Sequence, residues 1–134
     1  MAEIKRGGLE MKGCALVVFS GQADFKALRF LKKDFRHCFV LLPRGGGWIL
    51  YNPLSHQTDI AVHGAVTVEA LAKWYGKQGY RVVQCTEKSA PRKLAPLRPY
   101  TCVEAVKRVL GIQNGWILTP WQLYRYLSGR PGTI

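Results

Sequence analysis

Three residues of this sequence, Cys102, His37 and Asn52, have types and expected positions that suit nucleophilic chemistry. The segment from Thr101 to Glu104 has the form of a helix capping box. In this motif the Thr101 hydroxyl accepts a hydrogen bond from the Glu104 N–H, and the Glu104 carboxylate reaches back to the Thr101 N–H. Cys102 then occupies the first helical position, where free N–H groups and the positive end of the helix dipole favour a thiolate. Cys102 is therefore a candidate nucleophile.

A structural interpretation of Cys102 is also open. Cys102, Val106 and Val109 recur at the helical spacing i, i+4 and i+7, which equally predicts one buried stripe with the thiol as a small hydrophobic group. The remaining cysteines lie in apolar segments typical of buried strands, so we expect them to be core thiols: Cys14, Cys38 and Cys85.

A glycine-rich turn predicts a β-hairpin in the first half of the chain. Two β-type runs, 37–42 and 48–51, flank the segment 43–47, which contains three consecutive glycines. Because these glycines lead into a strand and not into a helix, we interpret them as a turn and not as a phosphate-binding loop. Trp48 and Tyr51 are expected hairpin residues, and Tyr51 is expected to lie near the substrate cleft of an enzyme that uses Cys102.

The hairpin supplies a candidate base and a residue to orient it. A thiolate nucleophile needs a base, usually histidine, which in turn needs an orienting group. If the turn is centred between residues 44 and 45, Leu42 faces Gly47 and His37 faces Asn52. Directly opposite side chains lie on the same face about 5 Å apart, so the Asn52 amide would hold the His37 ring beside Cys102. A one-residue slip would turn His37 and Asn52 to opposite faces.

Other polar and aromatic residues have weaker claims to a functional role. His63 shares a strand face with Asp59 and is an alternative base, although a surface position is the simpler interpretation, and His56 is expected to be solvated in a loop. Aromatic side chains near the C-terminus are expected to pack helices and not to form a ligand cage: Trp116, Trp121, Tyr124 and Tyr126.

The order of the expected elements predicts an α+β fold. Apolar runs and periodicity indicate strands at 14–19, 37–42, 48–51, 58–62 and 80–85, and helices at 22–35, 67–77, 101–110 and 120–127, with an irregular connection at 88–99. Because strands and helices do not alternate strictly, we expect a mostly antiparallel sheet packed against helices.

Length and composition fit one domain over residues 1–134, with a core at about 13–127, a short N-terminal lead and a loose C-terminal tail. A hydrophobic content of 48% argues against disorder. No apolar run approaches the ~18 residues of a membrane span or resembles a signal peptide, so we expect a cytoplasmic protein. The four cysteines form no C-x-x-C pair, and we expect no metal and no cofactor.

The net charge of +12 raises a second class of function. Nine basic and two acidic residues lie between Lys73 and Arg108, a density that would suit nucleic acid or another anionic polymer. The sequence shows no zinc finger, RNP-like motif or phosphate loop. The alternative to an enzyme is therefore a non-catalytic basic module that binds nucleic acid or serves in an assembly.

The segments His37-Cys-Phe-Val-Leu-Leu42 and Pro99-Tyr-Thr-Cys102-Val-Glu-Ala-Val, with Asn52 between them, resemble a known family. They are similar to the circularly permuted papain-like, NlpC-type thiol hydrolases, which include the lecithin:retinol acyltransferase-like proteins. Permuted members place a strand-borne histidine before the helix-borne cysteine, as this sequence does. The resemblance covers roughly residues 13–127 and implies a papain-like fold.

The resemblance also implies an activity. The family mechanism is attack of a thiolate on an amide or ester carbonyl, followed by hydrolysis or transfer of the acyl-enzyme, with Cys102, His37 and Asn52 as the triad. The resemblance assigns no oxyanion hole here: from its position the Cys102 N–H is one natural donor, and Gln22, just after the first expected strand, is a candidate for another. We expect a peptidase or amidase acting on peptide or acyl substrates. Because similar small domains occur in bacteria and phages, cell-wall peptides are the expected substrate, and a virion component is a further expectation. The sequence indicates no oligomeric state.

Overall fold

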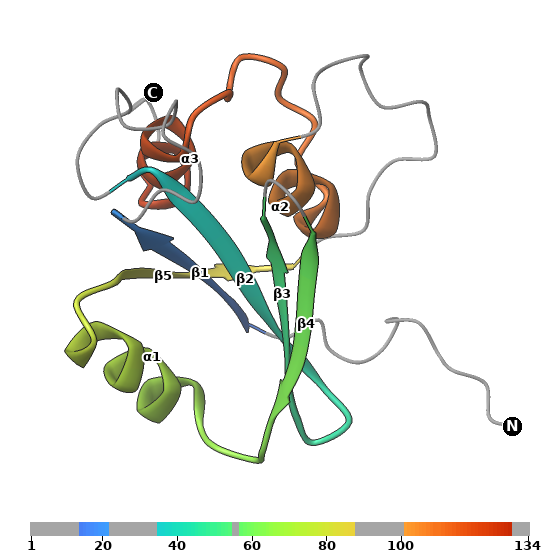
Figure 1. Ribbon diagram of the computed structural model, residues 1–134, viewed down its shortest axis with the longest axis vertical. Helices are drawn as coiled ribbons and strands as arrows, with labels where there is room; N and C mark the ends of the chain where they lie inside the picture. Colours follow the sequence, from blue (N-terminus) through green and yellow to red (C-terminus); the bar gives the residue numbers. More distant parts are fainter. Residues whose placement is uncertain (1–13, 22–34, 55–56, 88–100, 130–134) are drawn as a thin grey trace, which may run out of the picture.

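One antiparallel sheet positions the residues singled out above. The computed structural model describes residues 14–21, 35–54, 57–87 and 101–129 (Figure 1). Its five-stranded sheet has the order β4-β3-β2-β1-β5, and all neighbouring strands run antiparallel. The strands are β1 (Cys14–Ser20), β2 (His37–Arg44), β3 (Gly47–Pro53), β4 (Thr58–His63) and β5 (Arg81–Thr86). The helices of the described residues are α1 (Val68–Lys77), α2 (Cys102–Leu110) and α3 (Pro120–Leu127).

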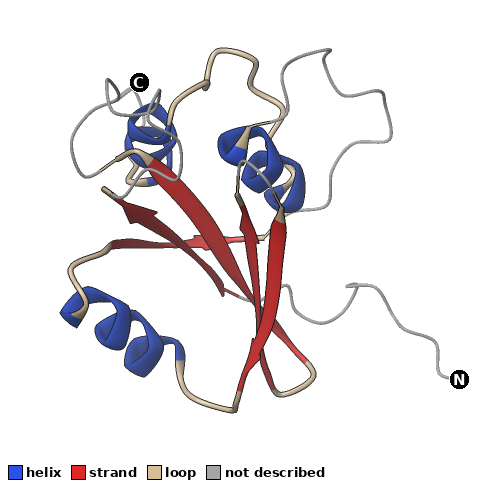
Figure 2. Ribbon diagram, viewed as in Figure 1, coloured by secondary structure: helices blue, strands red, loops and turns tan. Residues whose placement is uncertain are grey.

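Helices cover both faces of the sheet (Figure 2). On one face, α2 and α3 cover a core cluster that includes Val17 and Val106. On the other face, α1 covers a second cluster that includes Val18 and Leu71. The central strands β1 and β2 are therefore buried on both faces, which explains why they are almost continuous apolar runs.

The predicted α+β class and the mostly antiparallel sheet are confirmed. The strands expected at 14–19, 58–62 and 80–85 correspond to β1, β4 and β5, and the helices expected at 67–77, 101–110 and 120–127 correspond to α1, α2 and α3. Gly79, expected just past α1, has a φ of 98° that suits glycine. The helix expected over 22–35 and the connection over 88–99 lie outside the described residues, except for Phe35, which is buried in the core.

The hairpin turn lies one residue further along the chain than predicted. Gly45 and Gly46 are its two central residues, with φ values of 54° and 83°. Strand β2 therefore continues to Arg44, which pairs with Gly47. Placing the centre between Arg44 and Gly45 was wrong. The two-residue turn that matches strand twist needs positive φ at both central positions, which Gly45 and Gly46 adopt readily and Arg44 would not.

This turn shifts the register of β3 by two residues. Leu42 lies opposite Ile49 and not opposite Gly47, so the prediction that His37 directly faces Asn52 is also wrong. Side chains along a strand alternate between the two faces of the sheet with a period of two residues. A two-residue shift therefore leaves His37 and Asn52 on the same face, whereas a one-residue shift would have separated them.

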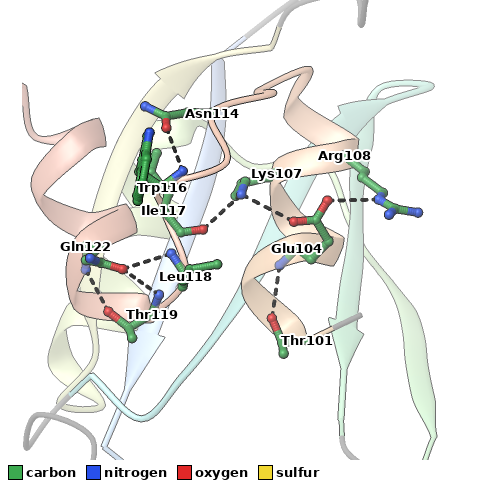
Figure 3. Close-up of polar contacts among 10 residues, drawn as sticks. All are labelled: Thr101, Glu104, Lys107, Arg108, Asn114, Trp116, Ile117, Leu118, Thr119 and Gln122. Carbon is green, nitrogen blue, oxygen red and sulfur yellow. Dashed lines mark hydrogen bonds and ion pairs between the residues drawn. The ribbon is translucent and has the colours of Figure 1, made fainter. Parts of the chain in front are cut away.

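Helix α2 begins with a capping hydrogen bond. The Thr101 hydroxyl accepts from the Glu104 N–H at 3.3 Å, as predicted (Figure 3). The return half of the predicted capping box is wrong, because the Glu104 carboxylate engages Lys107 at 3.3 Å and Arg108 at 3.1 Å instead. These cations lie three and four residues along the helix, where an intrahelical pair can form. The helix ends at Leu110 and is capped by Gly111, which has a φ of 78°.

A buried lysine joins α2 to the connection that leads into α3. Lys107 is 2% exposed, and its ammonium donates to the Ile117 carbonyl at 2.9 Å as well as pairing with Glu104 (Figure 3). The side-chain oxygen of Gln122 accepts from the Thr119 N–H at 3.0 Å and completes a capping box at the start of α3. These bonds fix the end of the connection to both helices.

We expect Lys107→Met to lower the free energy of unfolding by about 3 kcal/mol, because it leaves the Glu104 carboxylate buried with a lost partner. Urea unfolding measures the change. Arg108→Met is the matched control: the Arg108 side chain is 42% exposed, so its loss should cost less than about 1 kcal/mol. Equal unfolding midpoints for the two variants would contradict a stabilising role for the buried pair.

The pH dependence of the Lys107→Met effect provides a check on its cause. Burial acts to raise the pKa of Glu104, but hydrogen bonds from Arg108 and Lys107 hold that pKa below its usual range. A carboxyl whose pKa is lower in the folded state stabilises the fold above its unfolded pKa, and this stabilisation is lost as the pH falls through the folded value. The difference in the free energy of unfolding between the wild type and Lys107→Met should therefore become smaller below about pH 4.

Candidate active site

The His37 ring lies at the start of β2 and is held from β3. His37 is 8% exposed and pairs with Ser20 of β1. Its Nε2–H donates to Oδ1 of Asn52 at 2.6 Å. Val40 pairs with Tyr51, so Asn52 is a diagonal neighbour of His37 on the same face, within reach of long side chains. The bond places the proton of the neutral ring on Nε2 and leaves Nδ1 as the acceptor.

Cys102 is the first residue of α2, directly after the N-cap Thr101. N–H groups in the first turn of a helix have no acceptor within the helix, and the helix dipole favours negative charge there. The Cys102 side chain is hydrogen-bonded to the side chains of Cys38 and His37. The structure therefore places Cys102, His37 and Asn52 in one continuous chain of contacts.

These contacts lower the pKa of Cys102 to about 5. The largest cause is the hydrogen bond from the Cys38 side chain, which outweighs the opposite effect of burial. The hydrogen bond and the positive charge of His37 lower the pKa further, as does a hydrogen bond from the Cys38 backbone. At neutral pH these effects favour the Cys102 thiolate over the thiol.

Cys38 is a neighbour of Cys102 that the sequence analysis missed. It is the core thiol that we predicted, fully buried in the cluster beneath α2. Burial raises the pKa of Cys38 well above its usual value, and the contact with Cys102 raises it further, so the thiol keeps its proton and donates it in the hydrogen bond. The available signal was its place in the strand: the residue after His37 must face the opposite side of the sheet, where a cysteine-bearing helix packs.

The arrangement has the parts that acyl transfer requires. The Cys102 thiolate is a nucleophile, the His37 ring can accept and return a proton, and Asn52 fixes the ring. The Cys102 backbone N–H at the start of α2 is suited to stabilise an oxyanion. Gln22, the other predicted oxyanion donor, lies outside the described residues.

The alternative base, His63, is engaged elsewhere. Its Nε2 and the Tyr75 hydroxyl share a hydrogen bond of 3.0 Å, and its ring packs against Trp74 of α1. His63 thus belongs to the contacts between β4 and α1. His56 lies outside the described residues, so its predicted solvated position stays a prediction.

The remaining cysteines have different surroundings from Cys102. Cys85 packs against the core cluster, as predicted, and burial raises its pKa to about 11. Cys14 is half-buried, and its thiol donates to the side-chain oxygen of Gln84 at 3.5 Å. Both thiols are free, as are Cys38 and Cys102.

The aromatic residues near the C-terminus divide into two groups. Trp121, Tyr124 and Tyr126 pack against the core cluster, as predicted. The prediction is wrong for Trp116, whose side chain is 84% exposed. The connection between α2 and α3 buries Ile117 instead, so its neighbour Trp116 points outward.

In the predicted basic half of the chain, the described residues Lys73, Lys77 and Arg81 are exposed. Lys107 is buried, and Arg108 is paired with Glu104. Four other basic residues of this half lie outside the described residues: Lys88, Arg92, Lys93 and Arg98. Within the parts of the chain that are described, no three His, Cys, Asp or Glu side chains are grouped so as to hold a metal ion, and no helix is long and apolar enough to cross a bilayer.

The fold is α+β. In the site, a cysteine at the start of a helix contacts a histidine on a strand, and this histidine in turn contacts an asparagine on the neighbouring strand. Comparisons of the chain with models of protein families, with curated proteins and with solved structures find no match. The class of protein is therefore inferred from the geometry of the site.

We expect iodoacetamide to alkylate Cys102 with a half-maximal rate near pH 5, because the thiolate is the reactive form and predominates above the pKa. At neutral pH Cys38 and Cys85 should react far more slowly, since burial raises the pKa of both thiols. Peptide mapping by mass spectrometry measures the rate at each site.

Two variants separate the causes of this reactivity. His37→Ala removes both a hydrogen bond and a positive charge, so the midpoint for Cys102 should move to higher pH. His63→Ala is the matched histidine control and should leave the midpoint unchanged, because His63 bonds to Tyr75. Uniform slow labelling of all the cysteines in the wild type would contradict an activated thiol.

Proposed function

We propose that the protein is a thiol hydrolase with a Cys-His-Asn triad and a permuted papain-like, NlpC-type fold. The observation that carries the proposal is the His37 ring, which donates to Asn52 at 2.6 Å and also hydrogen-bonds Cys102 at the start of α2. Chain order supports the permuted arrangement, because the histidine strand β2 precedes the cysteine helix α2. The antiparallel sheet with α2 packed against β2 is consistent with it.

The proposed reaction begins with attack of the Cys102 sulfur on the carbonyl carbon of an amide or ester. The carbonyl oxygen becomes an oxyanion, which the Cys102 backbone N–H stabilises. The His37 imidazolium gives its proton to the departing amine or alcohol, and a thioester remains on Cys102. His37 then accepts a proton from water, whose oxygen attacks the thioester, and the acid product leaves as the thiolate reforms.

Each residue of the triad has a distinct requirement that its surroundings meet. Cys102 must be ionised, and its lowered pKa of about 5 provides this at neutral pH. His37 must present Nδ1 to the sulfur, and the bond from Nε2 to Asn52 selects that orientation. Because Asn52 is a neutral amide, it orients the ring without removing the ring proton.

The proposed substrates are peptides or other acyl compounds, with cell-wall peptides as the first class to test. The resemblance to small bacterial and phage domains supports this choice, and a phage origin belongs to the same proposal. A bacterial cell wall carries anionic groups, which the net charge of +12 would attract.

We expect Cys102→Ala and His37→Ala to abolish most of the hydrolysis of an activated ester or of peptidoglycan peptides. Loss of a general base typically costs about 10²- to 10⁴-fold in rate. Asn52→Ala should reduce the rate less than His37→Ala does, because the ring keeps its chemistry but loses its orientation. Release of product, followed by chromatography, gives the rate of each variant.

The matched controls are Cys85→Ala and His63→Ala, which remove the same residue types from outside the triad. Both should keep the wild-type rate. A wild-type protein that forms no thioester on Cys102 with any activated ester, or a Cys102→Ala variant as active as Cys85→Ala, would overturn the proposed function.

A further inference from the structure

Two cysteines from distant parts of the chain meet at the candidate site. Cys38 belongs to the core cluster beneath α2, and Cys102 packs against the same cluster. Helix α2 packs on strand β2, and the two side chains are hydrogen-bonded to each other. Cys38 is 0% exposed, whereas Cys102 is only partly buried. Of this pair, only Cys102 retains exposure to solvent.

We propose that Cys38 and Cys102 form a reversible disulfide when the protein meets a hydroperoxide, which makes this pair a redox modification site. The proposal rests on the reactive Cys102 of the proposed function, but it does not require that the protein hydrolyse any substrate. Cys102 is the residue that is oxidised first, and Cys38 is the resolving cysteine.

The first step oxidises Cys102. Its thiolate sulfur attacks one oxygen of the hydroperoxide, the O–O bond breaks, and the departing alkoxide or hydroxide takes a proton from the His37 imidazolium. Cys102 becomes a sulfenic acid, and the hydroperoxide is reduced to an alcohol or to water. Thiols with a low pKa and some exposure to solvent are the ones that undergo this step; the pKa of Cys102 is lowered, and the residue is only partly buried.

The second step joins the two cysteines. The Cys38 sulfur attacks the Cys102 sulfur, the S–O bond of the sulfenic acid breaks, and the hydroxide that leaves takes the Cys38 proton to become water. A dithiol reductant reverses the change by thiol–disulfide exchange. Condensation with a neighbouring thiol competes with further oxidation to the sulfinic acid, which is irreversible in ordinary reductants. Cys38 would therefore protect Cys102 and, while the disulfide lasts, block its nucleophilic sulfur.

The other two cysteines provide an internal control. Cys14 pairs with Thr86, and Cys85 pairs with Ala15, on the neighbouring strands β1 and β5. Directly paired residues share a face and adjacent residues alternate, so Cys14 and Cys85 point to opposite faces of the sheet. They are close along the ladder but are not positioned for a disulfide.

The experiment treats the full chain with hydrogen peroxide, alkylates the remaining thiols and maps cross-linked peptides by mass spectrometry. The wild type and Cys85→Ala should both yield a Cys38–Cys102 peptide that disappears after dithiothreitol. Cys38→Ala should instead accumulate Cys102 as sulfinic or sulfonic acid, which dithiothreitol does not reverse. Cys38→Ser, which preserves the volume of the side chain, should behave as Cys38→Ala does if the fold is kept.

Failure of this inference is distinguishable from failure of the proposed function, because the readout is a peptide mass and not a rate of hydrolysis. Irreversible oxidation of Cys102 in the wild type with no cross-link to Cys38 would overturn the inference, even in an active hydrolase. A Cys14–Cys85 cross-link in its place would also overturn it. A reversible Cys38–Cys102 cross-link in a protein without hydrolase activity would support it.

Discussion

The packing of the first turn of α2 against the start of β2 is the contact on which the site depends. Neighbouring strand residues leave the sheet on opposite faces, so the side chains of His37 and Cys38 start in opposite directions. Cys102 contacts both because it is the first residue of its helix and meets β2 where the strand begins. Asn52 holds His37 from the next strand. Moving α2 by one turn, about 5.4 Å, would break every one of the Cys102 contacts.

A buried charge ties α2 to the connection that leads into α3. Removing the Lys107 ammonium from water carries a large desolvation cost, which is offset only where Glu104 and the Ile117 carbonyl meet it. With an apolar side chain at position 107, several arrangements of α2 and the connection to α3 would have similar free energies. With lysine there, any arrangement that leaves the buried ammonium without a partner is strongly destabilised. Lysine is among the residue types least often buried, so no hydrophobic pattern predicts that Lys107 lies in the interior. The pattern likewise gives no sign that the large apolar side chain of Trp116 is exposed.

The sequence predicted the elements more reliably than their register. Apolar runs and caps are local signals, and they located the strands and helices of the described residues within one or two positions. The turn centre depended on choosing among three glycines, and Gly45 with Gly46 fits a two-residue turn best. The His37–Asn52 pair survived this error because the shift was an even number of residues. The contact of Cys38 with Cys102 joins segments 64 positions apart, which no local pattern encodes.

Surroundings, and not residue type, separate the thiols. Burial raises the pKa of Cys38 and Cys85. The pKa of Cys102 is instead lowered to about 5, because its hydrogen bonds outweigh the effect of burial. The Cys38 hydrogen bond stabilises the Cys102 thiolate only while Cys38 keeps its proton, so the pair holds one negative charge and not two. The hydrogen bond and the positive charge of His37 act on that same sulfur and lower its pKa further. The net charge of +12 on the chain therefore acts on the approach of anionic partners, whereas the reactivity of Cys102 is set by its own neighbours.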